Sequence, residues 1–377
     1  MIAYLTIGDN PSGIFSSQVI DTCKFLTELS GKRVKLIALL SIRGFWKNRK
    51  KIKEEYANSM VLPMVPKLEN WRWNLITIQI IFSFLKGYSV IGRNAIPTVL
   101  AIKLKRKNLI NKVIYDGRGC EYEQIKEYNV ISNSYLANEI FENEKLAATA
   151  SDYQLAVSKA LVEYWRKTFE YKNSKPFIIP CTFSLETRLS SKEAITRSSL
   201  GIFESDIVLA YSGTISGWQS FQLMFQFLED HLIYYQNLKV ILLTQKTKEI
   251  EQLIEKFQGR VIHLWVKTSE VKNYLELADY GLLIREASIT NWVASPIKFA
   301  DYLGAGLKVI VNEGSIEQVI SFIENHQCGM IYSKKVISSL EKQRVEKKKK
   351  IKKLAQEHYT KPSPKNLNLY KKLIESC

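Results

Sequence analysis

The sequence is poor in the residues from which proteins build metal sites and disulfides. Its 377 residues include 4 histidines and 5 cysteines. These form neither a C-x-x-C nor an H-E-x-x-H arrangement, the spacings typical of zinc sites and redox motifs. No D-x-D carboxylate pair occurs either. We therefore expect no metal ion and no cofactor, and we interpret the cysteines as the reduced thiols of a cytoplasmic protein.

We also expect neither a secretory leader nor a membrane-spanning helix. The sequence begins MIAYLTIGDN, where no basic segment precedes the apolar residues. The apolar stretch 73–85 has 13 residues, whereas a membrane span needs about 20. We expect it to form mostly a core helix, with an interfacial helix as the alternative. The expected location is the cytoplasm, with peripheral contact at the inner face of the cytoplasmic membrane as a further option.

Acidic residues are scarce at both ends of the chain. The formal net charge is +17. Residues 1–190 carry 28 lysines and arginines against 17 acidic residues, residues 191–333 carry 12 against 16, and residues 334–377 carry 14 against 4. A basic half attracts anionic partners such as phospholipid headgroups, nucleic acid or polyphosphate ligands. A solvated basic surface without a specific partner is the alternative.

Short apolar runs alternate with helix-length segments from end to end. Such alternation predicts parallel strands covered by helices on both faces. It predicts an α/β chain of two Rossmann-like, doubly wound domains. The runs that we interpret as strands are 2–8, 33–40, 59–65, 88–92, 112–116, 153–158, 206–217, 238–244, 259–266, 278–284, 307–312 and 328–333.

The alternation breaks once, which indicates the domain boundary. A polar segment rich in serine, threonine and arginine follows Pro180, and we interpret residues 181–200 as a hinge. The expected domains are 1–180 and 201–354, and we expect a C-terminal helix at about 355–377 to pack back on the first domain. Because ligands of open α/β sheets bind outside the carboxyl ends of the strands, we expect the site in the cleft between the domains.

The segment after the run 278–284 has the features of an anion site. Arg285 follows the predicted strand, Ser295 is placed to cap the next helix, and Pro296 is placed at its first position. Lys298 then falls in the first helical turn, where free backbone N–H groups attract a diphosphate. Asp301 lies on the same helix face and suits the hydroxyls of a ribose. A well-capped surface helix with a Lys–Asp pair is the alternative.

The residues GLLIRE and NWVASPIKFADYLGAGLKVIV together resemble the nucleotide-sugar segment of GT-B glycosyltransferases of the family 4 type. The resemblance implies that Asp301, at the position of the family's glutamate, contacts the donor ribose, and that Arg285 and Lys298 lie near the donor diphosphate. Two departures are Lys308, where the family usually has proline, and Val293, where it has an earlier glutamate.

The segment YSGTISGWQS, residues 211–220, resembles the Gly-rich turn that this family places against the donor phosphates. Gly213 and Thr214 are the residues that the resemblance assigns to donor binding. Many members have an arginine after the glycine and a lysine at the helix start, whereas this chain has Thr214 and then Trp218 and Gln219. Backbone N–H groups of the turn remain available to hold phosphate.

The segment VIYDGRGCEYEQ, residues 113–124, resembles the D-x-R-G segment of some GT-B enzymes. No histidine precedes His231, so the candidates for catalysis are Asp116, Arg118 and Glu121. A carboxylate would take a proton from an acceptor hydroxyl, and Arg118 would neutralise the departing phosphate. The alternative is a local ion pair in which Asp116 caps the loop and Arg118 pairs with it.

The first predicted strand–helix loop, GDNPSGIFSSQV, lacks G-x-G-x-x-G, so a dinucleotide site is not indicated. In GT-B enzymes this loop reaches the donor phosphates or the acceptor, and Gly13 is the residue that we assign to it. A tight structural turn is the alternative. Two basic, aromatic stretches, 44–53 and 70–82, are candidates for acceptor or membrane contact.

The resemblance implies glycosyl transfer from a nucleotide-sugar donor to the hydroxyl of a glycan or lipid-linked glycan, in the assembly of a bacterial surface polysaccharide or glycoconjugate. The nucleotide-sugar is a substrate, and the reaction is expected to be metal-independent. Peripheral contact with an anionic membrane is a further expectation. The alternatives are a nucleotide-sugar epimerase of the same fold and a catalytically degenerate binding subunit. A nucleic-acid ligand for the Lys-rich tail is disfavoured.

Overall fold

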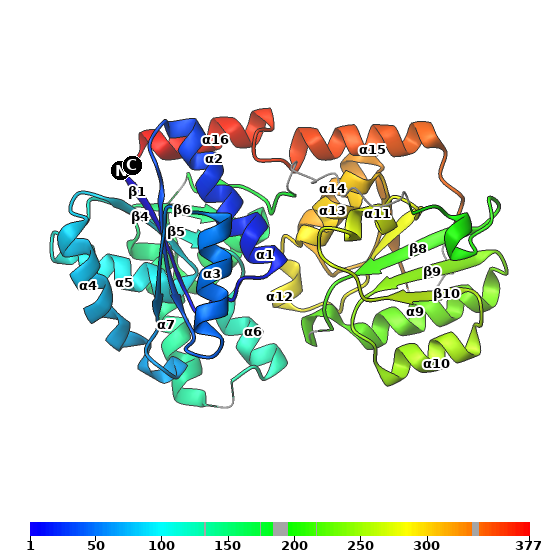
Figure 1. Ribbon diagram of the computed structural model, residues 1–377, viewed down its shortest axis with the longest axis horizontal. Coiled ribbons are helices and arrows are strands. Elements are labelled where there is room, and N and C mark those ends of the chain that lie inside the picture. The colour runs from blue at the N-terminus through cyan, green and yellow to red at the C-terminus, as the bar shows by residue number, and fades with distance from the viewer. Residues whose placement is uncertain (132, 174, 184–194, 216, 334–338) are drawn as a thin grey trace. The chain divides into compact units, whose positions relative to one another are not determined.

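The computed structural model of the chain describes residues 1–131, 133–173, 175–183, 195–215, 217–333 and 339–377. It contains two compact units, which are described separately here (Figure 1). Unit 1 consists of Met1–Thr182 together with Lys361–Cys377, and unit 2 consists of Phe183–Thr360. The chain therefore leaves unit 1 after Thr182 and returns to it at Lys361. Most of the expected hinge, residues 184–194, lies outside the described residues.

Unit 1 is built on a sheet of seven parallel strands in the order β3-β2-β1-β4-β5-β6-β7. Most of the strand residues are buried, because helices cover both faces of the sheet and leave little room for polar side chains. The strands are β1 (Ile2–Ile7), β2 (Lys35–Leu40), β3 (Ser59–Pro63), β4 (Ser89–Arg93), β5 (Val113–Gly117), β6 (Tyr153–Ala156) and β7 (Phe177–Ile178).

The helices of unit 1 are mostly the connections between successive strands. Side chains of α2, α3 and α16 pack on strands β1 and β2 in one hydrophobic core, while α5 and α7 contact each other and β5. The helical segments are α1 (Gly13–Phe15), η1 (Ser16–Ile20), α2 (Asp21–Ser30), α3 (Phe45–Glu55), η2 (Leu68–Trp73), α4 (Asn74–Phe84), α5 (Ala95–Arg106), α6 (Glu121–Tyr128), α7 (Ser134–Ala150), α8 (Lys159–Phe169) and α16 (Pro364–Glu375).

Unit 2 is built on six parallel strands in the order β10-β9-β8-β11-β12-β13. Two hydrophobic cores hold its helices to the sheet, one including α13 and α15 and the other including α9 and α10. The strands are β8 (Ile207–Ser212), β9 (Leu238–Leu243), β10 (Val261–Leu264), β11 (Tyr280–Leu283), β12 (Lys308–Asn312) and β13 (Gly329–Tyr332). The helical segments are η3 (Ser198–Leu200), η4 (Gly217–Gln219), α9 (Phe221–Tyr234), α10 (Lys248–Lys256), α11 (Val271–Leu275), α12 (Ile289–Trp292), α13 (Ile297–Ala305), α14 (Glu317–His326) and α15 (Val345–His358).

The two doubly wound sheets confirm the fold class predicted from the alternation of apolar runs. Of the two C-terminal helices, the Lys-rich α15 belongs to unit 2 and α16 belongs to unit 1. The expectation that 73–85 is mostly a core helix is wrong for one side of α4, where Ile76, Ile80 and Phe84 are exposed. No helix in the described part of the chain is long and apolar enough to cross a membrane.

Candidate functional site

The sheet of unit 2 has a switch point between β8 and β11. From β8 the chain proceeds through β9 to β10 on one side, and from β11 it proceeds through β12 to β13 on the other. Loops that leave the carboxyl ends of two such strands diverge and leave a crevice, which is where open α/β sheets bind ligands. The segment 213–220 follows β8, and the segment 284–288 follows β11. Three residues of the site, Gly213, Gln219 and Arg285, lie in these two segments.

Lys298, in the first turn of α13, reaches the end of β8. Its ammonium donates hydrogen bonds to Tyr211 Oη at 3.0 Å and to Gln219 Oε1 at 2.9 Å, and lies 4.2 Å from the centre of the Tyr211 ring. Gly213 makes this position possible. Its φ is +134°, and a Cβ built on it would lie 2.6 Å from Lys298 Nζ, so a larger residue would displace the lysine.

Arg285 shares a hydrogen-bond acceptor with Lys298. Its side chain is buried and donates to Gln219 Oε1 at 3.1 Å and to Asn291 Oδ1 at 3.3 Å. Its backbone N–H donates to Asn312 Oδ1 at 2.7 Å. One neutral amide oxygen, that of Gln219, therefore accepts from both cations. We call Arg285, Gln219 and Lys298 the cationic cluster.

The electrostatics of the cationic cluster favour an anionic ligand. Burial lowers the pKa of Lys298 well below its usual value, the charge of Arg285 lowers it further, and Asp301 acts in the opposite direction. Asp301 is partly exposed, and within the described residues its carboxylate has no hydrogen bond and no ion pair. A negative charge beside Lys298 and Arg285 would restore the charged form of the lysine and supply charge-assisted hydrogen bonds.

Asp301 lies three residues after Lys298 on α13, as the sequence predicts. Burial raises its pKa from the usual 3.8 to about 7, and Lys298 opposes this shift. The expected cap is wrong, because α13 begins at Ile297 and Pro296 occupies the capping position with ψ 127°. Ser295 therefore lies one residue before the cap. The extended ψ of Pro296 keeps this residue out of the helix, which explains the later start.

Thr214 is exposed, and its backbone carbonyl accepts a hydrogen bond from Tyr211 Oη at 3.0 Å. The same turn is tied to the loop after β11, because Ser220 Oγ accepts from the backbone N–H of Glu286 at 2.9 Å. From the sequence, Gln219 stands out only because the family often has a lysine near this position, and neither Tyr211 nor Asn291 is a candidate. Gln219 is identified by its hydrogen bonds to Arg285 and Lys298, which lie 66 and 79 positions away in the sequence. Asn291 is identified by its hydrogen bond to Arg285, six positions earlier.

In unit 1, Asp116 and Arg118 form a buried ion pair. Arg118 Nε lies 2.9 Å from Asp116 Oδ1, and Arg118 Nη2 donates to Asp116 Oδ2 at 2.9 Å. The Tyr4 hydroxyl donates to Oδ2 as well. Both carboxylate oxygens are thus occupied, and Arg118 has a further, weak contact of 3.5 Å with Gln18 Oε1. This is the arrangement that the alternative interpretation, a local ion pair, expects.

Glu121 belongs to a different group, at the carboxyl ends of β1 and β4. Between these strands lies the switch point of the unit 1 sheet, because the chain adds β2 and β3 on one side of β1 and β4 to β7 on the other. Arg93 Nε lies 3.4 Å from Asp9 Oδ2, and Glu121 Oε2 accepts from the Ala95 backbone N–H at 2.7 Å. Burial raises the pKa of Glu121 from 4.5 to about 7, with Asp9 adding to the rise and Arg93 opposing it.

Two members of this group, Asp9 and Arg93, are not among the candidates from the sequence, although each directly follows a predicted strand. Gly13 is in the same unit and is the first residue of α1, whose cap is Ser12, with the Ser12 hydroxyl accepting from the Phe15 N–H at 3.3 Å.

Of the site residues predicted from the sequence, the structure brings Arg285, Lys298, Gly213 and Asp301 together in unit 2. Among the described residues, no group of three His, Cys, Asp or Glu side chains is arranged to hold a metal ion.

Comparisons with known proteins identify the fold. No protein-family model matches the chain, and no curated protein matches it. Sucrose-phosphate synthase from Thermosynechococcus elongatus matches with a TM-score of 0.66 at 12% identity, over 100% of this chain and 99% of that one. Anabaena HepE in complex with UDP matches with a TM-score of 0.66 at 12% identity, over 100% and 98%.

WaaG, a glycosyltransferase involved in lipopolysaccharide biosynthesis, matches with a TM-score of 0.60 at 13% identity, over 98% of this chain and 93% of that one. These likenesses extend over both units and confirm the GT-B fold, with its two Rossmann-like domains, that the sequence resemblance predicts.

Proposed function

We propose that the chain is a glycosyltransferase whose unit 2 binds the nucleoside diphosphate of a nucleotide-sugar donor. The observation that carries this proposal is the cationic cluster. Lys298 and Arg285 meet on one neutral oxygen at the switch point of the sheet, where α/β folds of this kind bind nucleotides. Two of the structural neighbours support the assignment, because HepE is described in complex with UDP and WaaG is described as a glycosyltransferase.

In the proposed complex, the diphosphate accepts hydrogen bonds from Lys298 and Arg285. The bond between the anomeric carbon of the sugar and the diphosphate oxygen breaks with its electron pair on the diphosphate, and the acceptor oxygen forms the new bond to that carbon. The two cations stabilise the negative charge that grows on the departing diphosphate. Asp301 accepts hydrogen bonds from the ribose hydroxyls, and Gly213 keeps the space above the phosphates open for Lys298. The charge on the leaving group is neutralised by side chains, and so the proposal requires no metal ion.

For unit 1 we propose that Glu121 takes the proton of the acceptor hydroxyl. Its pKa of about 7 suits a group that must accept a proton at neutral pH. Asp116 and Arg118 would then hold the loop between β5 and α6 through their ion pair. The proposed acceptor is a glycan or lipid-linked glycan of a bacterial surface polysaccharide, a class supported by the role of WaaG in lipopolysaccharide biosynthesis.

Calorimetric titration of UDP, GDP, CDP and dTDP tests the donor site. We expect one of these nucleotides to bind, and Lys298→Met to weaken its binding by about 10-fold or more, the loss of one charge-assisted hydrogen bond. Lys308→Met is the matched control, because Lys308 is also a partly buried lysine beside a tyrosine. Its Nζ lies 6.0 Å from the centre of the Tyr280 ring. If no nucleotide binds, or if both variants lose affinity equally, the proposed donor site is wrong.

Product analysis then separates transfer from epimerisation. A transferase releases the nucleoside diphosphate in the presence of an acceptor, whereas an epimerase converts the nucleotide-sugar without needing one. We expect the release to depend on Glu121, so that Glu121→Gln lowers kcat by about 100-fold or more while the affinity for the nucleotide, measured by the same calorimetry, is retained. Equal turnover by Glu121→Gln would show that another group takes the proton.

A further inference from the structure

The two helices that meet at Glu121 both begin without a side-chain cap of their own. Helix α6 starts at Glu121 itself, and its cap residue, Cys120, makes no capping hydrogen bond with its side chain. Helix α5 starts at Ala95, and its cap residue, Asn94, makes none either. The first N–H groups of a helix have no partner within the helix, so the start of a buried helix needs an acceptor from elsewhere.

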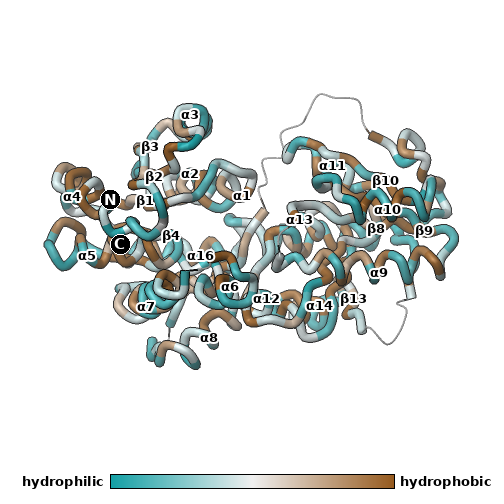
Figure 2. The backbone as a smooth tube through the Cα atoms, turned by 90° about the horizontal axis from the view of Figure 1, so that it is seen from below, coloured by the Kyte–Doolittle hydropathy of each residue, from teal (hydrophilic) through white to brown (hydrophobic). Residues whose placement is uncertain are grey.

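Two glutamates from neighbouring helices supply these acceptors. Glu144, on α7, accepts through Oε2 from the Tyr122 N–H of α6 at 3.0 Å. Glu121, on α6, accepts through Oε2 from the Ala95 N–H of α5 at 2.7 Å. Helix α7 contacts both α6 and α5, which are labelled around it in Figure 2. We call Glu144 and Glu121 the capping relay, because α7 holds the start of α6 and α6 holds the start of α5.

The two members of the capping relay differ in environment. Glu144 has an exposed fraction of 0%, and among the described residues no cation forms an ion pair with it. Burial raises the pKa of Glu144 well above its usual value, and the charge of Glu121 raises it further, whereas the backbone N–H of Tyr122 opposes the rise. Two neighbouring buried carboxyl groups are not both charged at low cost, so Glu144 keeps its proton and Glu121 titrates. The other titratable groups that face Glu144 are Glu123 from α6, Tyr115 from β5 and Tyr164 from α8.

We propose that Glu144 is a positioning residue for the acceptor reaction, because its hydrogen bond with Tyr122 fixes the start of α6 and so holds the Glu121 carboxylate in place. This inference rests on the proposed role of Glu121 as the group that takes the proton. The ion pair of Asp116 and Arg118 lies near the other end of the same β5–α6 loop. A misplacement of about 1 Å costs a catalytic group up to about 100-fold in rate, so a base at the end of a loop needs such support.

Hydrogen exchange of the full chain tests the capping relay without any substrate. Glu144→Met fills the same space without an acceptor, so we expect faster exchange at the start of α6 and at the start of α5. Glu144→Gln replaces a neutral acid with a neutral amide whose oxygen accepts from the same N–H, so we expect exchange as in the wild type. Circular dichroism would verify that both variants are folded. Unchanged exchange in Glu144→Met would overturn the inference, whatever Glu121 does in catalysis.

Turnover tests whether the relay positions the base. The rate is the release of nucleoside diphosphate from the nucleotide-glucose whose base the calorimetry selects, with water as the acceptor, since water also has to give up a proton. We expect Glu144→Met to lower kcat by about 10-fold or more with nucleotide affinity retained, and Glu144→Gln to keep the wild-type kcat. Since burial raises the pKa of Glu121 from 4.5 to about 7, its release toward solvent in Glu144→Met should move the acidic limb of the kcat profile to lower pH.

The outcomes of these measurements separate this inference from the proposed function. A lower kcat with an unmoved acidic limb would make Glu144 a purely structural residue and overturn the proposal. A Glu144→Gln variant as impaired as Glu144→Met would do the same, because the neutral acceptor would then not suffice. Wild-type turnover of Glu121→Gln, together with faster exchange in Glu144→Met, would instead refute the proposed base and with it the catalytic role of Glu144.

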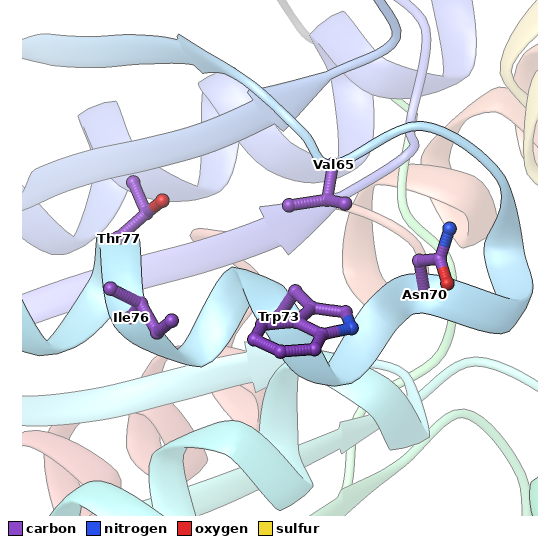
Figure 3. Close-up of a pocket in the computed structure, with 5 residues that line it drawn as sticks. All are labelled: Val65, Asn70, Trp73, Ile76 and Thr77. Carbon is purple, nitrogen blue, oxygen red and sulfur yellow. The ribbon is translucent and has the colours of Figure 1, made fainter.

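The matched control is Glu139→Met. Glu139 lies five residues before Glu144 on α7, and its side chain is 10% exposed. It accepts from Trp71 Nε1 at 3.0 Å and pairs with Arg72 at 2.7 Å, so it supports η2, the short helix that ends at Trp73 beside the surface hollow in Figure 3. We expect faster exchange in η2 and an unaltered kcat. Equal effects of the two methionine variants on α6 and on kcat would indicate a general weakening of α7 and overturn the proposal.

Discussion

Gln219 holds the two cations of unit 2 with an oxygen that carries no net charge. Its Oε1 accepts from Lys298 at 2.9 Å and from Arg285 at 3.1 Å. An amide in this place keeps the two side chains in position without neutralising them. A carboxylate in the same place would satisfy both cations and would compete with any anionic ligand.

The variant Gln219→Glu should therefore change ligand binding and stability in opposite directions. We expect nucleotide affinity to fall by about 10-fold or more, because the new carboxylate pairs with Lys298 and Arg285 in place of the ligand. We expect the melting temperature to rise, because the two buried cations gain an anionic partner. Calorimetry and thermal unfolding measure the two effects. Gln219→Met serves as the control, since it removes the shared acceptor without adding charge and should lower both quantities. A loss of both in Gln219→Glu would contradict the proposed electrostatics.

Asp301 gives unit 2 a pH dependence of definite sign. Its pKa rises from 3.8 in the unfolded chain to about 7 in the folded one. Between these values the folded state binds more protons at Asp301 than the unfolded state. The contribution of Asp301 to the free energy of unfolding is therefore greatest below about pH 4 and falls as the pH rises to 7. Asp301→Asn should flatten this decline, as followed by urea unfolding at several pH values. Glu255→Gln, which changes an exposed acidic residue of the same unit, should leave the decline unaltered.

At the scale of elements, the strands and the helix α13 were predictable because their information is local. Mainly apolar runs, such as residues 307–312, became strands, and this one is buried except at Lys308. Lys298 and Asp301 share a helix, as their spacing requires. The exposed side of α4 was not predictable, because the sequence of a short apolar helix does not show whether other elements cover one of its faces or both. Nor was the cationic cluster, whose hydrogen bonds join residues 66 and 79 positions apart.

The end of α13 depends on Gly306. Its φ is +85°, its N–H donates to the Leu303 carbonyl at 2.9 Å, and the N–H of Leu307 donates to the Tyr302 carbonyl at 2.9 Å. A Cβ at this position would lie 3.0 Å from the backbone oxygen of Lys348. This ending sets the path of the chain from the lysine and aspartate of the site into β12.

Gly306→Ala should lower the free energy of unfolding by about 1–2 kcal/mol or more, from the left-handed backbone and the close contact together. Gly259→Ala separates the two causes. Gly259 has a φ of +72° but no atom within 4 Å of a built Cβ, so this variant reports backbone strain alone and should cost less. Denaturant unfolding of both variants gives the comparison, and equal losses would mean that the contact with Lys348 has no effect.

At the scale of the whole molecule, unit 1 is made from two separate parts of the chain. Helix α16 packs on α2, with Phe25 and Tyr370 in an edge-to-face contact whose ring centres are 5.2 Å apart. Leu373 is fully buried in the same core. The last helix therefore completes a hydrophobic core whose other members precede Pro180.

Leu373→Ala should destabilise unit 1 selectively, by about 2–5 kcal/mol for a buried leucine. Hydrogen exchange followed by mass spectrometry would locate the effect, with faster exchange expected in α2 and α16 and unchanged exchange in α9 and α10. Leu253→Ala is the mirror control, because Leu253 is equally buried in the α10 core of unit 2. Faster exchange in both units from either variant would contradict the division of the chain into two compact units.

The return of the chain to unit 1 has a consequence for biosynthesis. A ribosome releases residues from the N-terminus onward, so all of Phe183–Thr360 has been made before α16 exists. Unit 2 has its whole sequence when unit 1 still lacks a helix, and the surface of α2 that α16 covers stays open in the meantime. The unit that is begun first is thus the one finished last, and a chain truncated near residue 360 would have the whole sequence of unit 2 but lack the last helix of unit 1.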